Sequence, residues 1–419
     1  MNINYKQYSD EFGLIKGFFF FLYVLGYKAL TKIIVRFIRR NVKLNDHIIV
    51  FESSPDYSDN SKALSDFLIA NKYTDYYKIY WSVNDPKLLK EPPKIANITF
   101  IEKKNKFHVD KISSAIIVNR AKYMITTHGF PMPLYKRRNG QHYIWLWHGS
   151  SFKGKTENED NGKKNRHGEF GFILVAGPLF VKPKSYFFNV DERFICPLGF
   201  PRYDWLLKKT TNALILKHDF CKDNERLLIW MPTFRNHPEG IYGSIQELST
   251  FPLIKEQTEW SYLDKFCQEK KLVIVIKIHM FQKDYEIDFS KFKNIKIITN
   301  EVFDKENVNM YEFLAVTDAL ITDYSSVGID YLLVNKPIAY TLDDFEIYKN
   351  KRGFVVEDPR KFMPGHHLYK YSDLLTFLED ISKGKDMYES QRKQMYGVAI
   401  HKSNNYCKEI ADKIGLKQN

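Results

Sequence analysis

The chain has 419 residues, of which 44% are hydrophobic and 16% aromatic, so it is too long for one ordinary domain and rich enough in apolar residues for two cores. Its net charge of +13 is compatible with nucleic acid, an anionic membrane surface or a polyanionic substrate. The four cysteines, Cys196, Cys221, Cys267 and Cys407, form no C-x-x-C pair and no metal-ligand spacing, which favours free thiols in a reducing cytoplasm.

An apolar segment with interspersed basic residues covers residues 12–40. Between Lys16 and Lys28 it has only eleven residues without a charge, fewer than the roughly 20 that a membrane span needs. It also lacks the small-residue cleavage site of a signal peptide. The pattern predicts an interfacial helix, aromatic on one face and basic on the other, that meets anionic lipids. A core helix of the first domain is the alternative.

From residue 45 on, strand and helix patterns alternate, which predicts a parallel sheet with helices on both faces. The predicted strands of this first domain are 47–51, 79–83, 98–101, 123–126, 143–147 and 172–176.

The strand 143–147 runs into a glycine-rich basic loop that begins with His148. A histidine at a strand end is well placed for chemistry here, because the glycines give backbone access and Lys153 and Lys155 supply positive charge. A histidine that only caps a surface loop is the alternative. His128 follows an earlier strand in the same way, and we expect it to have a structural or acceptor-side role.

A polar helical bridge at 208–223 leads to a second alternating series. Its predicted strands are 227–230, 272–278, 295–298, 319–321 and 337–340, and the chain beyond residue 369 is expected to be helical. After the first of these strands, Thr233 and Arg235 offer a hydroxyl and a guanidinium to phosphate oxygens. The strand 272–278 leads directly to His279.

The stretch 319–337 has the pattern of a strand, a polar turn and a helix start. Ser325 and Ser326 would lie at the helix N-terminus, where free N–H groups and the helix dipole favour phosphate. Asp330, five residues after Ser325, would then reach the hydroxyls of a ribose. A Ser/Asp-capped helix of any α/β protein is the alternative.

Together these side chains comprise two strand-end histidines, one in each domain, and a set of phosphate-binding candidates in the second domain. Two doubly wound domains facing a cleft would bring them together, with a donor nucleotide on the second domain and an acceptor on the first. This is the layout of a nucleotide-dependent transferase.

The chain resembles the CDP-glycerol glycerophosphotransferase family of teichoic acid and capsule polymer synthesis. The resemblance keeps the family's order and covers nearly all of the chain after residue 45. The matching stretches are YSDNSKAL at 57–64, WLWHGSSFKGK at 145–155, GFPRYD at 199–204, PTFR at 232–235, KIH at 277–279, TDYSSVGIDY at 322–331, and RGF with the later MPG within 352–365.

This resemblance implies a GT-B-like α/β fold of two Rossmann-like parallel-sheet domains and an enzyme that needs no metal or cofactor. It implies transfer of a polyol phosphate, glycerol phosphate before ribitol phosphate, from a CDP-polyol to a hydroxyl of a growing teichoic acid-like or capsular polymer or its lipid-linked primer, with release of CMP. The enzyme would be peripheral on the cytoplasmic face of the membrane. We expect a membrane-associating segment at 1–44, an acceptor-side domain at 45–207, a CDP-polyol-binding domain at 208–390 and a C-terminal helix at 391–419.

The resemblance also assigns roles to the candidate residues. His148 and His279 would be catalytic, His148 as general base of an in-line displacement at the β-phosphorus, although the two roles could be exchanged. The donor-binding candidates are Thr233, Arg235, Thr322, Ser325, Ser326 and Asp330, and the acceptor-side candidates are Tyr57, Asp59, Asn60, Lys153 and Lys155.

Three departures from the family pattern leave the polyol and the acceptor open. Ser150, Ser151 and Phe152 stand where the family often has Thr-Pro-Leu, Met280 where it has proline, and His366 and His367 where apolar residues are expected. A GT-B glycosyltransferase that uses a nucleotide sugar is the first rival. The second is a non-catalytic basic protein, and neither aromatic-basic interleaving nor a helix-turn-helix supports nucleic acid as its partner. The sequence does not indicate an oligomeric state.

Overall fold

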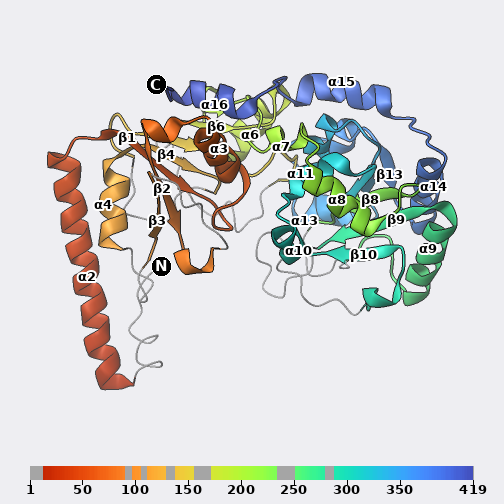
Figure 1. Cartoon of the computed structure of the whole chain (residues 1–419), viewed down its shortest axis with the longest axis horizontal. Helices are drawn as coiled ribbons and strands as arrows, with labels where there is room; N and C mark the ends of the chain where they lie inside the picture. The colour runs from red at the N-terminus through yellow and green to blue at the C-terminus, as the bar shows by residue number, and fades with distance from the viewer. Residues whose placement is uncertain are drawn as a thin grey trace. The chain divides into compact units, whose positions relative to one another are not determined.

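The computed structural model describes residues 13–89, 97–104, 111–128, 137–154, 171–233, 251–278 and 287–418. Contacts divide the chain into two compact units, each with a parallel sheet and flanking helices (Figure 1). Of the described residues, unit 1 contains those up to His148, Gly171–Ile173 and those from Cys407 on, and unit 2 contains the rest. The predicted fold class of two parallel-sheet α/β domains is confirmed.

The first sheet has the order β3-β2-β1-β4-β5-β6-β7. The pairings from β3 through to β6 are all parallel. In chain order the strands span Asn45–Glu52, Lys78–Val83, Ile98–Glu102, Ala121–Thr126, His142–Trp145, Phe172–Leu174 and Ile195–Cys196. The strand order reverses between β1 and β4, and in sheets of this kind ligands bind outside the carboxyl ends of the strands at such a reversal.

Two helices cover the faces of this sheet, α3 (Asp59–Ala70) and α4 (Ile112–Arg120), and they lie on opposite sides of it in Figure 1. Trp81 of β2 donates a hydrogen bond to Ser65 of α3 over 3.1 Å and stacks on Phe51 of β1. Successive side chains of a strand point to opposite faces of the sheet. Glu52 and Ser82, which directly follow Phe51 and Trp81, therefore point away from α3.

Helix α2 (Leu14–Asn41) packs on α4 along one narrow side. Its buried residues, Gly17, Val24, Thr31, Val35 and Ile38, recur every seven residues or one turn apart. Two contacts fix it there: the Tyr27 hydroxyl accepts from the Ile112 N–H over 3.2 Å, and Arg39 donates to Asn119 over 3.2 Å. Most of its other large apolar side chains are exposed. The predicted N-terminal helix is confirmed.

By length and composition alone, α2 is long and apolar enough to cross a membrane. The prediction that this segment is too short to span a membrane was based on the eleven residues between Lys16 and Lys28. It does not hold for the whole helix, because α2 continues beyond both lysines.

The second sheet has six parallel strands in the order β10-β9-β8-β11-β12-β13, with its reversal between β8 and β11. In chain order, β8 to β13 span Arg226–Trp230, Leu272–Lys277, Ile295–Ile298, Ala319–Thr322, Ile338–Thr341 and His366–Leu368. The five predicted strands of this domain are confirmed, and β13, like β7, is additional.

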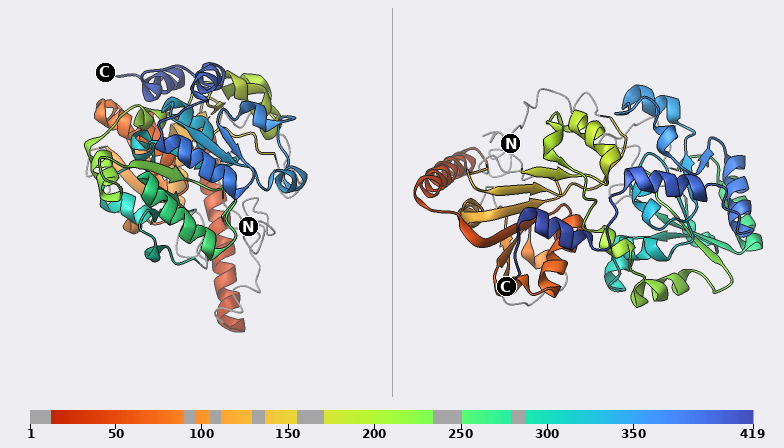
Figure 2. Two further views of the ribbon diagram at one scale, coloured as in Figure 1. Left: turned by 90° about the vertical axis from the view of Figure 1, so that its right-hand side faces the viewer. Right: turned by 90° about the horizontal axis from the view of Figure 1, so that it is seen from above.

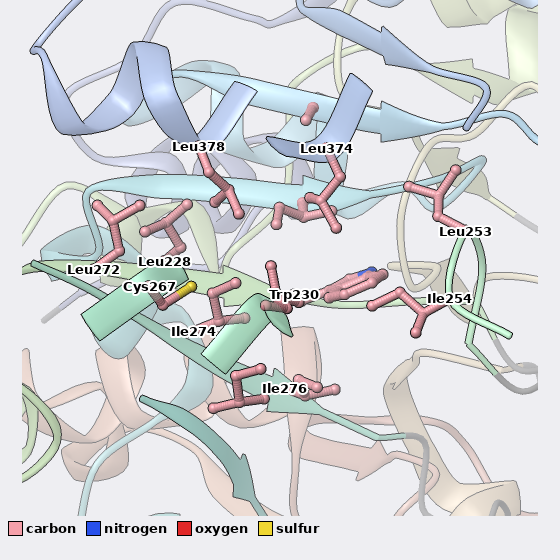
Figure 3. Packing of buried hydrophobic residues seen from close by; sticks show 14 of the residues in the cluster. Leu228, Trp230, Leu253, Ile254, Cys267, Leu272, Ile274, Ile276, Leu374 and Leu378 are labelled. Atoms are coloured by element: carbon pink, nitrogen blue, oxygen red, sulfur yellow. The ribbon is translucent and has the colours of Figure 1, made fainter. Parts of the chain in front are cut away.

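The core of unit 2 lies between this sheet and the helices α9 (Gln257–Lys270) and α14 (Tyr371–Ser382). Figure 3 shows Trp230 and Ile274 of the sheet beside Cys267 of α9 and Leu374 and Leu378 of α14. These side chains are completely buried, so the sheet is a rigid base for the loops at its carboxyl edge.

Shorter helices complete the two units. They are α6 (Val181–Phe188), α7 (Tyr203–Leu206), α8 (Thr211–Phe220), α10 (Asn300–Lys305), α11 (Met310–Val316), α12 (Val327–Asp330), α13 (Phe345–Lys351), α15 (Glu389–Ala399) and α16 (Tyr406–Ile414). The region after residue 369 is helical, as predicted.

The unit boundaries differ from the predicted domain limits at three places, the first being the described residues 149–154, which were expected in the first domain but belong to unit 2. Residues 174–207 were expected in the first domain but belong to unit 2, where Arg202 and Tyr203 bind Asp330. The end of the chain belongs to unit 1 and lies beside α3 in Figure 2. There Cys407 contacts the Ala63 carbonyl and the Lys417 N–H donates to the Tyr77 hydroxyl over 3.1 Å.

Candidate active site

Asp323 organises the loops at the strand-order reversal of unit 2. It follows the last residue of β11, is completely buried, and accepts hydrogen bonds from the backbone N–H of Thr233 over 2.7 Å and of Ser325 over 3.1 Å. The Thr233 hydroxyl also donates to it. Since β8 and β11 are neighbours, Thr233 and Ser325 are brought to one edge of the sheet, as the sequence predicted. Asp323 itself was not among the predicted site residues.

Lys153 lies beside these residues in unit 2. Its Nζ donates to Thr233 Oγ1 over 3.1 Å. The segment around it pairs with residues 353–355, through the bonds from the Gly154 N–H to the Gly353 carbonyl and from the Val355 N–H to the Phe152 carbonyl, each 2.9 Å long. Lys153 was expected on the acceptor side, but these contacts group it with a donor-side candidate.

Ser325 and Ser326 precede α12, which has four residues and continues as a 3-10 turn over Tyr331–Leu333. The helix that was expected to start here is therefore short, and its dipole is correspondingly weak. A side chain on Gly149, whose φ is +131°, would clash with Ser326 Oγ and come within 3.0 Å of Arg202 Nη2. Only glycine allows the loop to approach this closely.

Asp330 lies in the interior and not on an open surface. Its carboxylate accepts hydrogen bonds from Arg202 Nη2 over 2.6 Å, from the Tyr203 hydroxyl over 2.7 Å and from the Tyr311 hydroxyl over 3.1 Å. Burial, followed by the nearby charge of Asp330, raises the pKa of Tyr203 well above its usual value. The expected contact of Asp330 with a ribose has no support in this geometry, because the carboxylate is fully buried among three donors.

Thr322 is buried in the same way, and its hydroxyl donates to the Met231 carbonyl over 2.9 Å. Its side chain holds β8 against β11 and faces no open surface, so it has no support as a donor-binding residue. Arg202 was missed as a partner of Asp330, although the stretch GFPRYD that contains it had been noted.

In unit 1, His148 stacks on His128 with the ring centroids 4.5 Å apart and the planes 5° apart. The Trp147 ring lies 3.8 Å from the His148 ring, and the Thr127 hydroxyl is 2.8 Å from His128 Nδ1. The Asn60 amide donates to the Trp147 carbonyl over 2.8 Å. His128 and His148, which follow two strands of the first sheet, are thus adjacent, and the Asn60 side chain of α3 holds the peptide before His148.

The other two acceptor-side candidates in α3 and its preceding loop have left-handed backbones, with φ of 51° at Tyr57 and 54° at Asp59. The Tyr57 ring packs edge-on against Trp81 and Phe100. The structure therefore shows Tyr57 packed against neighbouring aromatic rings. Its contact with an acceptor stays a prediction.

Glu52 at the end of β1 was not predicted as a site residue. It is 5% exposed and forms a 2.9 Å ion pair with Lys103, which also lies 3.3 Å from Asp56. Burial, with a smaller contribution from Asp56, raises the pKa of Glu52 to about 7 against the lowering effect of Lys103. A carboxyl group that titrates near neutral pH at the carboxyl end of a strand is typical of functional sites.

Three predicted site residues, His279, Arg235 and Lys155, lie outside the described residues, as does Met280. Within the described part of the chain, no group of three or more His, Cys, Asp or Glu side chains is placed to hold a metal ion. The four cysteines are buried and unbridged, which confirms the prediction of free thiols.

Two parallel-sheet units with polar loops at the carboxyl ends of their strands define a doubly wound α/β protein of two Rossmann-like units. The family of CDP-glycerol:poly(glycerophosphate) glycerophosphotransferases matches residues 34–408, and the chain belongs to this family of enzymes. Membership excludes the alternative of a non-catalytic basic protein.

The chain matches curated relatives at low identity and covers most of the length of two of them. The chain is 25% identical to the teichoic acid poly(glycerol phosphate) polymerase of Bacillus spizizenii over 82% of this chain and 86% of that protein. It is 25% identical to the teichoic acid glycerol-phosphate transferase of Staphylococcus aureus over 84% and 88%. The ribitol-phosphate polymerase TarL of S. aureus matches 65% of this chain, which spans 48% of that protein.

A solved structure of the wall teichoic acid polymerase TagF superposes with a TM-score of 0.74 and 20% identity. The match covers 94% of this chain and 96% of that chain. The similarity confirms the GT-B-like fold.

Proposed function

We propose that this enzyme transfers glycerol phosphate from CDP-glycerol to a hydroxyl of a teichoic acid-like or capsular polymer, or of its lipid-linked primer, and releases CMP. The family match over residues 34–408 carries this proposal. Glycerol is favoured over ribitol because the matching family model is that of a glycerophosphotransferase, and because four glycerol-phosphate enzymes among the relatives match 77–84% of the chain, whereas four ribitol-phosphate enzymes match 56–78%.

In the proposed reaction, the acceptor oxygen bonds to the β-phosphorus of the donor while the bond from that phosphorus to the bridging oxygen breaks. CMP leaves with the electron pair, and a base takes the acceptor proton. Lys153, Thr233 and Ser325 at the edge of the second sheet would bind the phosphate oxygens, together with Arg235, which follows β8 in the sequence, and His279, which follows β9. In phosphoryl transfer such positioning and charge stabilisation provide most of the rate.

His148 would be the base, because imidazole is the side chain that most often serves as a general base in enzymes. The stacked ring of His128 and the Asn60 bond to the preceding carbonyl would hold its ring in one orientation. His279 remains the alternative base, and no cofactor or metal enters the proposed reaction.

We further propose that α2 binds the cytoplasmic surface of the membrane. An exposed apolar stripe follows the helix at intervals of about one turn, at Ile15, Phe19, Leu22, Leu30, Ile33 and Phe37. A basic row lies beside its second half at four-residue spacing, Lys28, Lys32, Arg36 and Arg40. A charged row along an apolar stripe is typical of a helix that lies in the membrane plane and meets anionic lipids.

Incubation of the purified protein with CDP-glycerol, CDP-ribitol and several nucleotide sugars, each with a synthetic acceptor, tests the function. We expect CMP release and a product mass increase equal to one or more glycerol phosphate units. A mass increase equal to ribitol phosphate would correct the polyol. Turnover of a nucleotide sugar without CMP release would instead establish the glycosyltransferase alternative.

A further inference from the structure

Tyr340 of β12 has a buried hydroxyl group that lacks a hydrogen-bond partner in the described structure. The residue is 2% exposed and lines a narrow pocket together with Lys153, Ser325 and Gly328. Tyr340 is the register partner of Thr322 on β11, so it lies one strand away from the loop that Asp323 organises. The position that a Cβ on Gly328 would take is 3.4 Å from the hydroxyl, which places this hydroxyl against the start of α12.

An unpaired buried hydroxyl destabilises the folded state, and native proteins rarely keep one without a reason. Tyr331, nine residues earlier in the chain, provides a comparison. It is equally buried, but its hydroxyl lies 2.9 Å from the Thr317 hydroxyl. Burial raises the pKa of the Tyr340 hydroxyl, so it stays protonated and can donate at neutral pH.

Three cations at or near the pocket, Lys153, Lys184 and Arg352, outnumber the one carboxylate in its lining, Asp323, which already accepts hydrogen bonds from Thr233 and Ser325, so the charges favour an anion as the missing partner. Lys153 lines the pocket, and Lys184 of α6 is buried nearby, since Phe180 beside it packs on Phe152 with ring centroids 4.9 Å apart. Burial, then Lys153 and Arg352, lowers the pKa of Lys184 to about 7. Cations that destabilise one another in this way are stabilised by a bound anion.

The size of the pocket limits which part of a ligand can reach the hydroxyl. The space at its centre is about that of one water molecule. A single oxygen atom fits this space and a nucleobase ring does not.

We propose that Tyr340 donates a hydrogen bond from its hydroxyl to a phosphate oxygen of the CDP-polyol donor, on which Lys153 and Ser325 also act. This assignment rests on the proposed function and adds to it a binding residue that no sequence motif indicated.

Calorimetric titration of wild type, Tyr340→Phe and Tyr331→Phe with CDP-glycerol, CMP and cytidine tests the assignment. A hydrogen bond to a charged group corresponds to roughly a tenfold or larger change in affinity. For Tyr340→Phe we expect CDP-glycerol to bind about tenfold more weakly or worse, an unchanged affinity for cytidine, and an unchanged or higher melting temperature. For Tyr331→Phe, the matched control, we expect a lower melting temperature and wild-type affinity for CDP-glycerol.

Equal binding of CDP-glycerol by wild type and Tyr340→Phe would overturn the assignment. An equal loss for cytidine would overturn it as well, since the contact would then be to the base or ribose. If wild type binds no CDP-polyol, the proposed function fails first and the assignment fails with it, so the two failures are distinguishable.

Discussion

Arg202 and Asp330, 128 residues apart in the chain, form a 2.6 Å ion pair that is closed off from solvent. The Arg202 guanidinium also lies 4.5 Å from the ring centroid of Tyr311, whose hydroxyl donates to the same carboxylate. The pair therefore joins the turn before α7 to α11 and α12, and so determines where Ser326 and the Gly149 loop meet.

Asp330→Ala should lower the free energy of unfolding by about 3–5 kcal/mol, because it leaves the Arg202 charge buried without its partner. Urea denaturation measures this change. Tyr203→Phe, which removes one donor only, should cost about 1 kcal/mol. Replacing both charges, as in Arg202→Met with Asp330→Leu, should recover much of the loss. Wild-type stability of Asp330→Ala would contradict the structural role.

His148→Ala should lower kcat about 100- to 10,000-fold, the usual contribution of a positioned general base. Donor affinity should stay near wild type, because the donor-side candidates belong to unit 2. The matched control is His142→Ala, at the other end of β5, which should leave kcat near wild type. A folded His148→Ala protein that binds donor normally and keeps more than about a tenth of the rate would exclude His148 as the base.

Glu52 should make stability depend on pH between about 4.5 and 7. Its pKa is raised from 4.5 to about 7 on folding, so in this window the folded state holds a proton that the unfolded state releases. Stability from this group is therefore complete below pH 4.5 and falls as the pH rises toward 7. Urea titrations of wild type and Glu52→Gln at a series of pH values measure the slope, which the variant should flatten. An unchanged slope would show that Glu52 does not titrate in this range.

Substituting the exposed apolar stripe of α2 should release the protein from anionic vesicles. Ile33→Asp with Phe37→Asp removes two side chains that are 66% and 61% exposed, so the fold should be unaffected. Each buried apolar side chain and each basic residue near the surface contributes roughly 1 kcal/mol or more to vesicle binding. Vesicle sedimentation measures the loss. Met387→Asp, at an equally exposed apolar residue of unit 2, serves as control. Retention of the wild-type protein in vesicles after carbonate washing would instead indicate a membrane span.

The strands at the centre of both sheets were predictable because their apolar runs are long and are bounded by turn residues. β7 and β13 were not, since they are two and three residues long and β13 consists largely of His366 and His367. Such short edge strands carry no periodic signal and form only because a neighbouring strand is already in place.

The residues of the candidate site that come directly after strands could be predicted from the sequence. Thr233 and Ser325 follow neighbouring strands of the second sheet, which brings them to one edge of it, and His148 follows a strand of the first sheet. Asp330 and Lys153 were placed less well, because the sequence does not say which side of a short helix is buried or with which unit a long loop packs. Tyr340 gave no signal at all, since an aromatic residue in a strand is ordinary core composition.

The first unit contains both the earliest and the latest residues of the chain, because residues 407–418 return to α3 and Tyr77. During synthesis the ribosome must therefore produce all of unit 2 before the last contacts of unit 1 can form. Domains ordinarily fold in the order in which they emerge. Here the amino-terminal unit is finished last, and a premature stop before residue 407 would damage the part of the protein that was made first.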